Sequence, residues 1–482
     1  MGLLGILVAL GVLIWLAYRG WSVLLLAPAS ALLAAGLAGE PLLAHWTQTF
    51  MGSAAHFTMQ FFPIFLLGAL FGKLMEDSGS VSSIAKFMTQ RLGPKRSVLA
   101  VVLAGAIVTY GGVSLFVAFF VLAPMADELF RAAGIPKRLM PAAIALGTST
   151  FTMSALPGTP AIQNAIPMPF FGTTPFAAPG LGITASVVML GFGLWWLARA
   201  EAKARSKGEG YGEATSTRDA AEDLVVRERA TTAGTFDPAE VSHSHQSPAG
   251  PPITLAALPL VVVVMVNLVM SLFVLPRMDA SFLADKAWGA TSLAAIGGVW
   301  AVVTSLAAAI VVLIAVNYRR LPALRASMDA GATASVLPVL SVASLVSFGS
   351  VVAALPAFAM VRNWVLSIEG GPLVSLAIAT NLLASLTGSA SGGLTIALDA
   401  LGATFLRIAT EHGIDPGLLH RVAVIGAGTL DSLPHNGAVV TLLAVCNSTH
   451  RESYFDIVMV SIVGGLLALV TVIGLGTAFG SF

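Results

Sequence analysis

The second half of the chain repeats a series of Gly- and Pro-containing dipeptides from the first half. Phe71-Gly72 recurs as Phe348-Gly349, and Leu156-Pro157 recurs as Leu433-Pro434, both 277 positions later. Three further pairs keep the same order at separations of 278 to 281 positions: Gly93-Pro94 with Gly371-Pro372, Gly111-Gly112 with Gly392-Gly393, and Gly134-Ile135 with Gly413-Ile414. We interpret this as an internal duplication. In an apolar chain, paired Gly and Pro interruptions indicate the binding site of a secondary transporter.

The composition places the duplicated halves in a membrane. Hydrophobic residues make up 56% of the 482 residues and charged residues only 10%, whereas a soluble domain carries about 25% charged residues. The single cysteine, Cys446, excludes an internal disulfide and a cysteine-based metal cluster. The run 2–18 lacks a basic start and a small-residue cleavage site, so it predicts a retained span. We expect no cofactor, no metal, no enzymatic activity and no nucleic-acid partner. We expect membrane lipid to surround the protein.

Apolar windows long enough to cross the roughly 30 Å hydrocarbon core predict ten spans. They are 2–18, 22–38, 57–74, 137–170, 181–198, 253–275, 288–316, 330–352, 418–447 and 456–479. Two more stretches, 95–131 and 372–411, are apolar with a Gly-rich break in the middle. Each is either a re-entrant hairpin or two additional spans. Segments 78–92 and 357–370, ahead of them, resemble interfacial arm helices.

The positive-inside rule sets the orientation. With hairpins and an outside N-terminus, the basic residues left outside are Arg277, Lys286, Arg362, Arg407 and Arg421, so 20 of the 25 Lys and Arg residues lie inside. The distribution of basic residues does not exclude two spans in place of each hairpin. The Gly-rich breaks carry no charge, which favours buried hairpin tips. Five crossings per copy then turn the second copy upside down.

The predicted fold is therefore an all-α polytopic membrane protein with two inverted repeats of five transmembrane helices. The repeats are 1–199 and 253–482, each with a re-entrant hairpin (95–131 and 372–411) and a broken helix (137–170 and 418–447). Both termini are periplasmic in this topology. Residues 200–252 form a polar cytoplasmic linker.

Four interruptions are predicted to meet at the binding site. Irregular backbone at membrane depth occurs only inside protein or beside an aqueous cavity. It exposes carbonyl groups and helix N-termini that can hold ions. The interruptions are the two hairpin tips and segments 152–160 and 429–437. The alternative is that these Gly and Pro residues only allow helices to pack and kink.

The predicted substrate-binding residues are the small and hydroxyl-bearing residues of the four interruptions, with two asparagines. They are Gly111, Gly112, Ser114, Thr152, Ser154, Gly158, Thr159, Asn164, Gly388, Ser389, Ser391, Gly392, Ser432 and Asn436.

Ionisable residues at depth are costly and usually functional. In this topology Asp431, His435 and Asp399 lie at membrane depth, and no Lys or Arg is expected beside the interruptions. Asp431 is the first candidate for a proton-coupling group, His435 the second and Asp399 the third. The alternative is a neutral side chain that holds the unwound segment. The absence of a nearby cation disfavours a di- or tricarboxylate, so the pattern predicts a small hydroxy monocarboxylate.

The same residues resemble the gluconate permease family, in particular its hydroxybutyrate permease branch, within the ion-transporter superfamily. The resemblance rests on the runs Tyr110 to Phe116, Ala155 to Pro167 and Asp431 to Gly437, and it covers nearly the whole chain outside 200–252. It implies proton-coupled uptake of sugar acids or short hydroxy acids across the bacterial inner membrane. The superfamily implies a homodimer and an elevator mechanism, in which the hairpins, arm helices and broken helices move.

Three other functions stay open. A sodium-coupled di- or tricarboxylate (for example citrate) carrier has the same fold, although the superfamily's sodium carriers have Ser-Asn-Thr at hairpin tips, which are absent here. A passive anion channel is disfavoured by paired broken helices. An intramembrane aspartyl protease would place an acid directly after its Gly-x-Gly pattern, whereas Thr429 and Leu430 separate Gly428 from Asp431.

Overall fold

The computed structural model describes residues 2–19, 21–212, 250–434 and 436–482, and these fold only into helices and connecting turns. Seven helices are long and apolar enough to cross a membrane, and four shorter apolar helices accompany them. The chain is therefore a multi-pass, all-helical membrane protein, as predicted. His435 and most of the predicted linker 200–252 lie outside the described residues.

The helices follow each other in a similar order in the two halves. The first half contains α1 (Gly2–Tyr18), α2 (Val23–Ala38), α3 (Leu42–Ala44), α4 (Met51–Asp77), α5 (Ser80–Leu92), α6 (Ser97–Tyr110), α7 (Leu115–Ala133), α8 (Met140–Thr148), α9 (Phe151–Ser154), α10 (Ile162–Ala165), α11 (Pro167–Phe171) and α12 (Pro179–Ser206). The second contains α14 (Ile253–Val269), α15 (Leu293–Asn317), α16 (Leu324–Ala334), α17 (Val336–Ala354), α18 (Phe358–Leu366), α19 (Gly371–Thr387), α20 (Ala390–Glu411), α21 (Pro416–Thr429), α22 (Gly437–Val445), α23 (His450–Ile457) and α24 (Gly464–Phe479).

One helix begins far earlier than hydropathy predicts. A π-helical segment, His45–Phe50, joins α3 to α4, so a single rod runs from Leu42 to Asp77, whereas the predicted window was 57–74. Polar residues such as Gln48 and Ser53 lower the hydropathy of the first turns. Helix geometry does not require an apolar sequence, so the rod continues through them.

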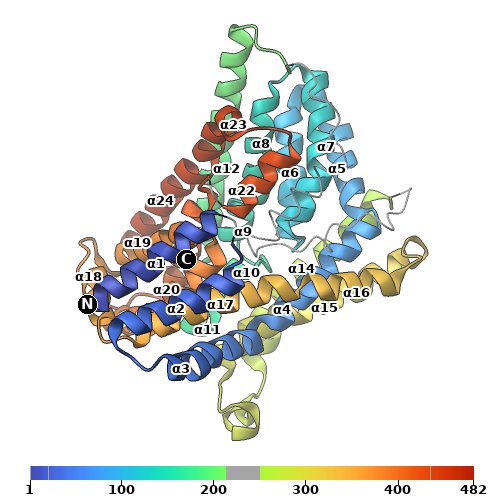
Figure 1. Cartoon of the computed structure of the whole chain (residues 1–482). Coiled ribbons are helices and arrows are strands. Elements are labelled where there is room, and N and C mark those ends of the chain that lie inside the picture. The colour runs from blue at the N-terminus through green and yellow to red at the C-terminus, as the bar shows by residue number, and fades with distance from the viewer. Residues whose placement is uncertain (1, 20, 213–249, 435) are drawn as a thin grey trace.

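The chain reverses direction at both Gly-rich breaks, and the helices on either side pack together. α6 packs against α7 around the turn at 111–114, and α19 packs against α20 around 388–389. Ser114 and Ser389 cap the second helix of each pair by accepting hydrogen bonds from the main-chain N–H groups of Phe116 and Gly392. Figure 1 shows α6 and α7 running side by side in the upper right of the molecule.

In each half, the part of the interrupted span that follows the interruption packs against the other half. In the second half, α22 follows the interruption and packs on α7 and α8 of the first half. In the first half, α10 and α11 follow the interruption and pack on α20 and α21 of the second half. The helix pairs α4–α17 and α12–α24 also join the halves. This crossing brings irregular segments that are distant in the sequence to one place.

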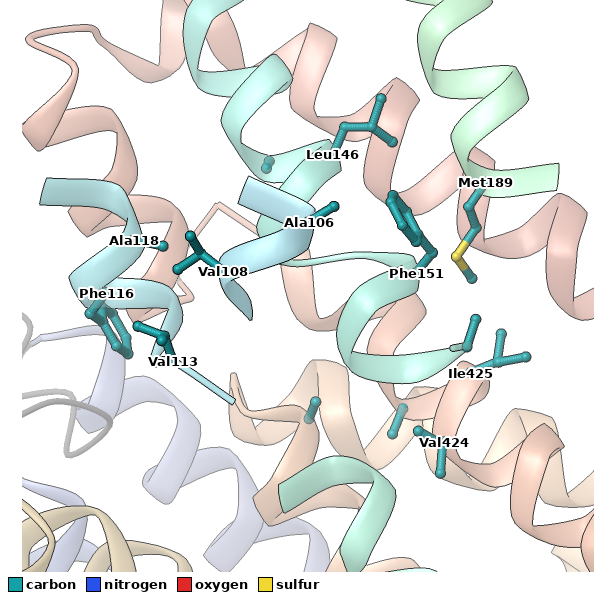
Figure 2. Packing of buried hydrophobic residues seen from close by; sticks show 14 of the residues in the cluster. Ala106, Val108, Val113, Phe116, Ala118, Leu146, Phe151, Met189, Val424 and Ile425 are labelled. Carbon is teal, nitrogen blue, oxygen red and sulfur yellow. The ribbon is translucent and has the colours of Figure 1, made fainter. Parts of the chain in front are cut away.

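One large buried core runs through both halves and surrounds the first hairpin. Figure 2 shows Val113 and Phe116 beside each other at the start of α7, with Val108 of α6 close by. On the other side of α8, Phe151 faces Met189 of α12. All five side chains are at most 5% exposed. Within a bilayer such close packing holds helices together, because lipid tails compete equally for apolar surface.

Glycine allows the closest helix contacts in both hairpin regions. A Cβ atom at Gly393 would lie 2.2 Å from the main-chain nitrogen of Ala384, inside the α19–α20 pair. A Cβ atom at Gly147 of α8 would lie 2.4 Å from the carbonyl oxygen of Val102 in α6. Any larger side chain would push main-chain atoms apart, so these glycines fix the separation of the helices.

We expect Gly393→Ala to open the α19–α20 pair and to destabilise the protein by about 1–3 kcal/mol. The matched control is Gly11→Ala in α1, because a Cβ atom there meets nothing within 4 Å. The control should be neutral or slightly stabilising, since alanine favours helix. Thermal unfolding of the purified proteins in detergent measures both. Equal midpoints for the two variants would contradict the assigned contact.

Candidate functional site

A cavity of about 230 Å³ lies where the hairpin turns and the interrupted spans meet. Residues 112–116 and 387–391 line it from the two turns, and 160–163 line it from the first interruption. Asp431, Asn436 and Ala438 line it from the second interruption. Residues of α4, α16 and α17 complete the wall. All four predicted interruptions therefore contribute to one cavity.

The predicted binding residues divide into two groups. Those that line the cavity are Gly112, Ser114, Gly388, Ser389, Ser391, Asp431 and Asn436. Those absent from its lining are Gly111, Thr152, Ser154, Gly158, Thr159, Asn164, Gly392, Ser432 and Asp399. His435 lies outside the described residues. Asp399 is instead on an exposed face of α20, where the Ser350 hydroxyl donates a hydrogen bond to it.

Asp431 joins the second interruption to the second hairpin turn. Its Oδ1 accepts hydrogen bonds from the Ala390 N–H and from Asn436 Nδ2, each 2.7 Å long. The carboxylate thus sits at the N-terminus of α20, where the helix dipole favours negative charge. Among the described residues that line the cavity, Asp431 is the one charged side chain.

Asn436 holds Asp431 in this position. Its Nδ2 also donates to the Gly388 carbonyl at 2.8 Å, and its Oδ1 accepts from the Ala438 N–H at 2.7 Å to cap α22. Both N–H groups of its amide are therefore used inside the protein, and its oxygen already accepts one hydrogen bond. Asn436 therefore positions the turn and the carboxylate, and its side chain offers little to a ligand.

Buried side chains satisfy the carbonyl groups of the first interruption. The Tyr110 hydroxyl donates to Pro157 O at 2.8 Å, and Asn267 Nδ2 donates to Gly158 O at 2.9 Å. Asn164 Nδ2 is 3.0 Å from both Thr159 O and Pro175 O. Unpaired carbonyls would be costly so deep in the protein. The unwound segment is therefore held by side chains on three different helices.

The prediction that no Lys or Arg lies beside an interruption is wrong. Arg421 of α21 is fully buried and donates to Ser154 O at 3.4 Å, to Asn164 Oδ1 at 3.3 Å and to Ala177 O at 2.7 Å. This contact was missed because counting charges along the chain does not reveal which carbonyl groups surround a guanidinium. Arg421 is absent from the cavity lining, so the cavity itself still has no cation among its described residues.

His420 belongs to the same buried cluster. Its Nε2 lies 3.1 Å from Asn164 Oδ1, and its Nδ1 lies 2.6 Å from Thr173 Oγ1. It is 0% exposed. Among the histidines, only His435 was predicted to lie at membrane depth, because the buried position of His420 depends on the fold of the first half around it.

The sequence-based prediction missed five polar residues in the cavity wall: Thr109, Gln163, Ser335, Ser341 and Thr387. Two of them have a buried side-chain oxygen without a hydrogen-bond partner among the described residues. Gln163 follows the first interruption, and Ser341 lies on α17. Neither Gln163 Oε1 nor Ser341 Oγ has a hydrogen-bond partner among the described residues. Gln163 could have been found, because it stands inside the run Ala155 to Pro167. Ser341 carries no sequence signal, since a serine in an apolar helix usually bonds its own helix carbonyl.

Comparison with known proteins gives a family match and a full-length relative. The model of the family described as "GntP family permease" matches residues 1–174. "Uncharacterized transporter YxjC" of Bacillus subtilis (strain 168) is 40% identical over 470 residues, which cover 96% of this chain and 96% of that protein. "High-affinity gluconate transporter" of Escherichia coli (strain K12) is 38% identical over 106 residues, covering 21% of this chain and 23% of that protein.

The fold has a counterpart among solved structures. The crystal structure of the Alcanivorax borkumensis YdaH transporter superposes with a TM-score of 0.55 at 16% sequence identity. The match covers 91% of this chain and 89% of that one. At this identity the likeness concerns the fold alone.

We expect Asn164→Leu to destabilise the protein by about 3 kcal/mol, because it leaves several buried polar groups without partners. Asn317→Leu on α15 is the matched control: Asn317 is also 0% exposed, but its amide atoms have no partner among the described residues. Its replacement should be neutral or stabilising. Thermal unfolding of both purified variants compares them. Similar losses in the two would contradict the role assigned to Asn164.

Proposed function

This chain belongs to the GntP family of membrane permeases, and on that premise we propose that it is a proton-coupled symporter of a small hydroxy monocarboxylate. The observation that supports this proposal is the set of ionisable side chains in the cavity. It contains one carboxylate, Asp431, and no cationic side chain among the described lining residues. Substrates of the gluconate or 3-hydroxybutyrate type fit this arrangement.

The cavity limits the size and charge of the substrate. About 230 Å³ is below the roughly 300–1,000 Å³ of pockets for drug-sized ligands. A di- or tricarboxylate would bring several charges next to Asp431 without a cation to balance them. One carboxylate can instead be held by main-chain N–H groups at a helix N-terminus. Hydroxyl groups of the substrate can pair with the serines and Gln163 of the wall.

Asp431 is the proposed proton carrier. Its hydrogen bonds to Ala390 and Asn436 tie the hairpin turn to the interrupted span, so a change in its charge acts on both elements. Nearby, His450 Nε2 lies 2.8 Å from Pro434 O, and His435 stands in the same segment. Asp399 lies away from the cavity and has no place in this mechanism.

The proposed movement follows the elevator scheme. The hairpins α6–α7 and α19–α20, the arm helices α5 and α18, and the interrupted spans move together against the other spans. The two halves act as inverted repeats that open the cavity alternately to each side. The protein works as a homodimer in the bacterial inner membrane, with outside termini and an inside linker at 200–252.

The coupling ion is tested by uptake of labelled 3-hydroxybutyrate or gluconate into proteoliposomes. We expect uptake to persist in sodium-free buffer and to collapse when a protonophore is added, since protons provide the driving force. Empty liposomes are the control. Uptake that requires sodium and survives the protonophore would establish the sodium-coupled alternative instead.

We expect Asp431→Asn to keep substrate exchange across the membrane but to lose proton-driven accumulation, because asparagine preserves the shape and loses the titrating group. Counterflow and gradient-driven uptake measure the two properties separately. Asp399→Asn is the control, as it also removes a carboxylate but lies outside the cavity. Undiminished accumulation by Asp431→Asn would remove this residue from the coupling mechanism.

A further inference from the structure

The two hairpin turns differ in what occupies the N-terminus of their second helix. At α20, the protein's own carboxylate fills this position, because the N–H of its first residue, Ala390, donates to Asp431 Oδ1 at 2.7 Å. This amide is therefore not available to an anion from outside. The Asp431 side chain therefore occupies the position at which an anion would bind this helix end.

The first hairpin has the same design without the carboxylate. Ser114 caps α7 as Ser389 caps α20, so the Leu115 N–H corresponds to the Ala390 N–H. The residue aligned with Asp431 is Ser154, whose Oγ donates to Thr150 O at 3.0 Å, within its own helix. No described residue accepts a hydrogen bond from the Leu115 N–H. Ser114 and Leu115 both line the cavity.

A second observation at the same cavity also calls for a ligand. Ser341 is only 3% exposed, it lines the cavity, and its Oγ has no partner among the described residues. The hydroxyl of Ser335, which also lines the cavity, donates to Ala332 O at 2.7 Å. Buried polar groups are nearly always paired. A hydroxyl group on the ligand would complete the bonding of Ser341. Gln163 Oε1 is a second acceptor without a hydrogen-bond partner in the described part of the chain.

We propose that the substrate carboxylate binds at the N-terminus of α7, on the Leu115 N–H and the Ser114 hydroxyl, and that Ser341 and Gln163 bind a substrate hydroxyl. The substrate carboxylate then binds the first hairpin in the way that the Asp431 carboxylate binds the second. This assignment rests on the transport function proposed above. It gives the site a direction, with the carboxylate at the first hairpin and the hydroxyl toward α17 and α10.

The main-chain contact is tested by Leu115→Pro. Proline suits the first position of a helix and lacks the N–H group, and Ser114 already has the extended conformation that a following proline requires (φ −52°, ψ 138°). Leu115→Ala is the reference, because it shortens the same side chain but keeps the N–H. Binding of 3-hydroxybutyrate and of butyrate to purified full-length protein is measured by calorimetry.

We expect Leu115→Pro to bind both acids about tenfold more weakly than Leu115→Ala, because both ligands use the carboxylate. Ser341→Ala should lower affinity for 3-hydroxybutyrate and leave butyrate unchanged, so the preference for the hydroxy acid shrinks. Ser335→Ala should keep that preference, since its hydroxyl bonds the helix. Thermal midpoints of all variants report folding.

Two results would overturn the assignment alone. One is equal affinity of folded Leu115→Pro and Leu115→Ala, and the other is a Ser341→Ala variant that loses affinity for both acids equally. If the wild-type protein binds neither of these acids nor gluconate, the proposed function fails and the assignment fails with it. A preference for citrate would have the same consequence.

Discussion

The structure depends on satisfying backbone polar groups where helices are interrupted inside an apolar protein. Lipid offers no hydrogen bonds, so each carbonyl and N–H group needs a partner within the protein unless it faces a cavity. In the first interruption Tyr110, Asn164 and Asn267 supply donors. In the second, Asn436 and Asp431 pair with the hairpin turn. These contacts come from helices of both halves, so the interruptions can exist only in the assembled fold.

The two halves satisfy the backbone groups of their interruptions with different side chains, and this difference bears on the proposed function. The first interruption is held by neutral amides and by a buried guanidinium, Arg421, which donates only to carbonyl and amide oxygens among the described residues. The second is held by a carboxylate that faces a cavity. A cation that is sealed into carbonyl groups has a fixed charge. A carboxylate beside a cavity can exchange its proton, which is why the proton coupling that we propose is assigned to the second half.

Much of this arrangement was visible in the sequence, and the exceptions share one cause. The Gly-rich stretches and the Pro-containing segments predicted the two hairpin turns and the two interruptions, because Gly permits irregular dihedral angles and Pro removes a backbone donor. These residues do not break every helix, since Pro63 lies inside α4 and Gly392-Gly393 lie inside α20. Hydropathy missed the first turns of the rod that begins at Leu42, where polar side chains lie on a continuous helix. The position of Arg421 beside the first interruption was also missed, because its partners lie in segments about 244 to 267 positions away in the chain. The sequence contains no pattern that marks Ser341, because its lack of a hydrogen-bond partner among the described residues depends on which residues pack around it.

The sequence by itself determined the class of protein and the positions where its helices break. Apolar composition, charge asymmetry and backbone-disrupting residues are local properties, and they act before any tertiary contact forms. Only the tertiary structure decided which side of each interruption faces the cavity, which polar groups are used internally and which remain for a ligand. Those outcomes depend on hydrogen-bond geometry between residues far apart in the chain. The Leu115 and Ala390 amides open equivalent helices, yet only one of them already holds a carboxylate.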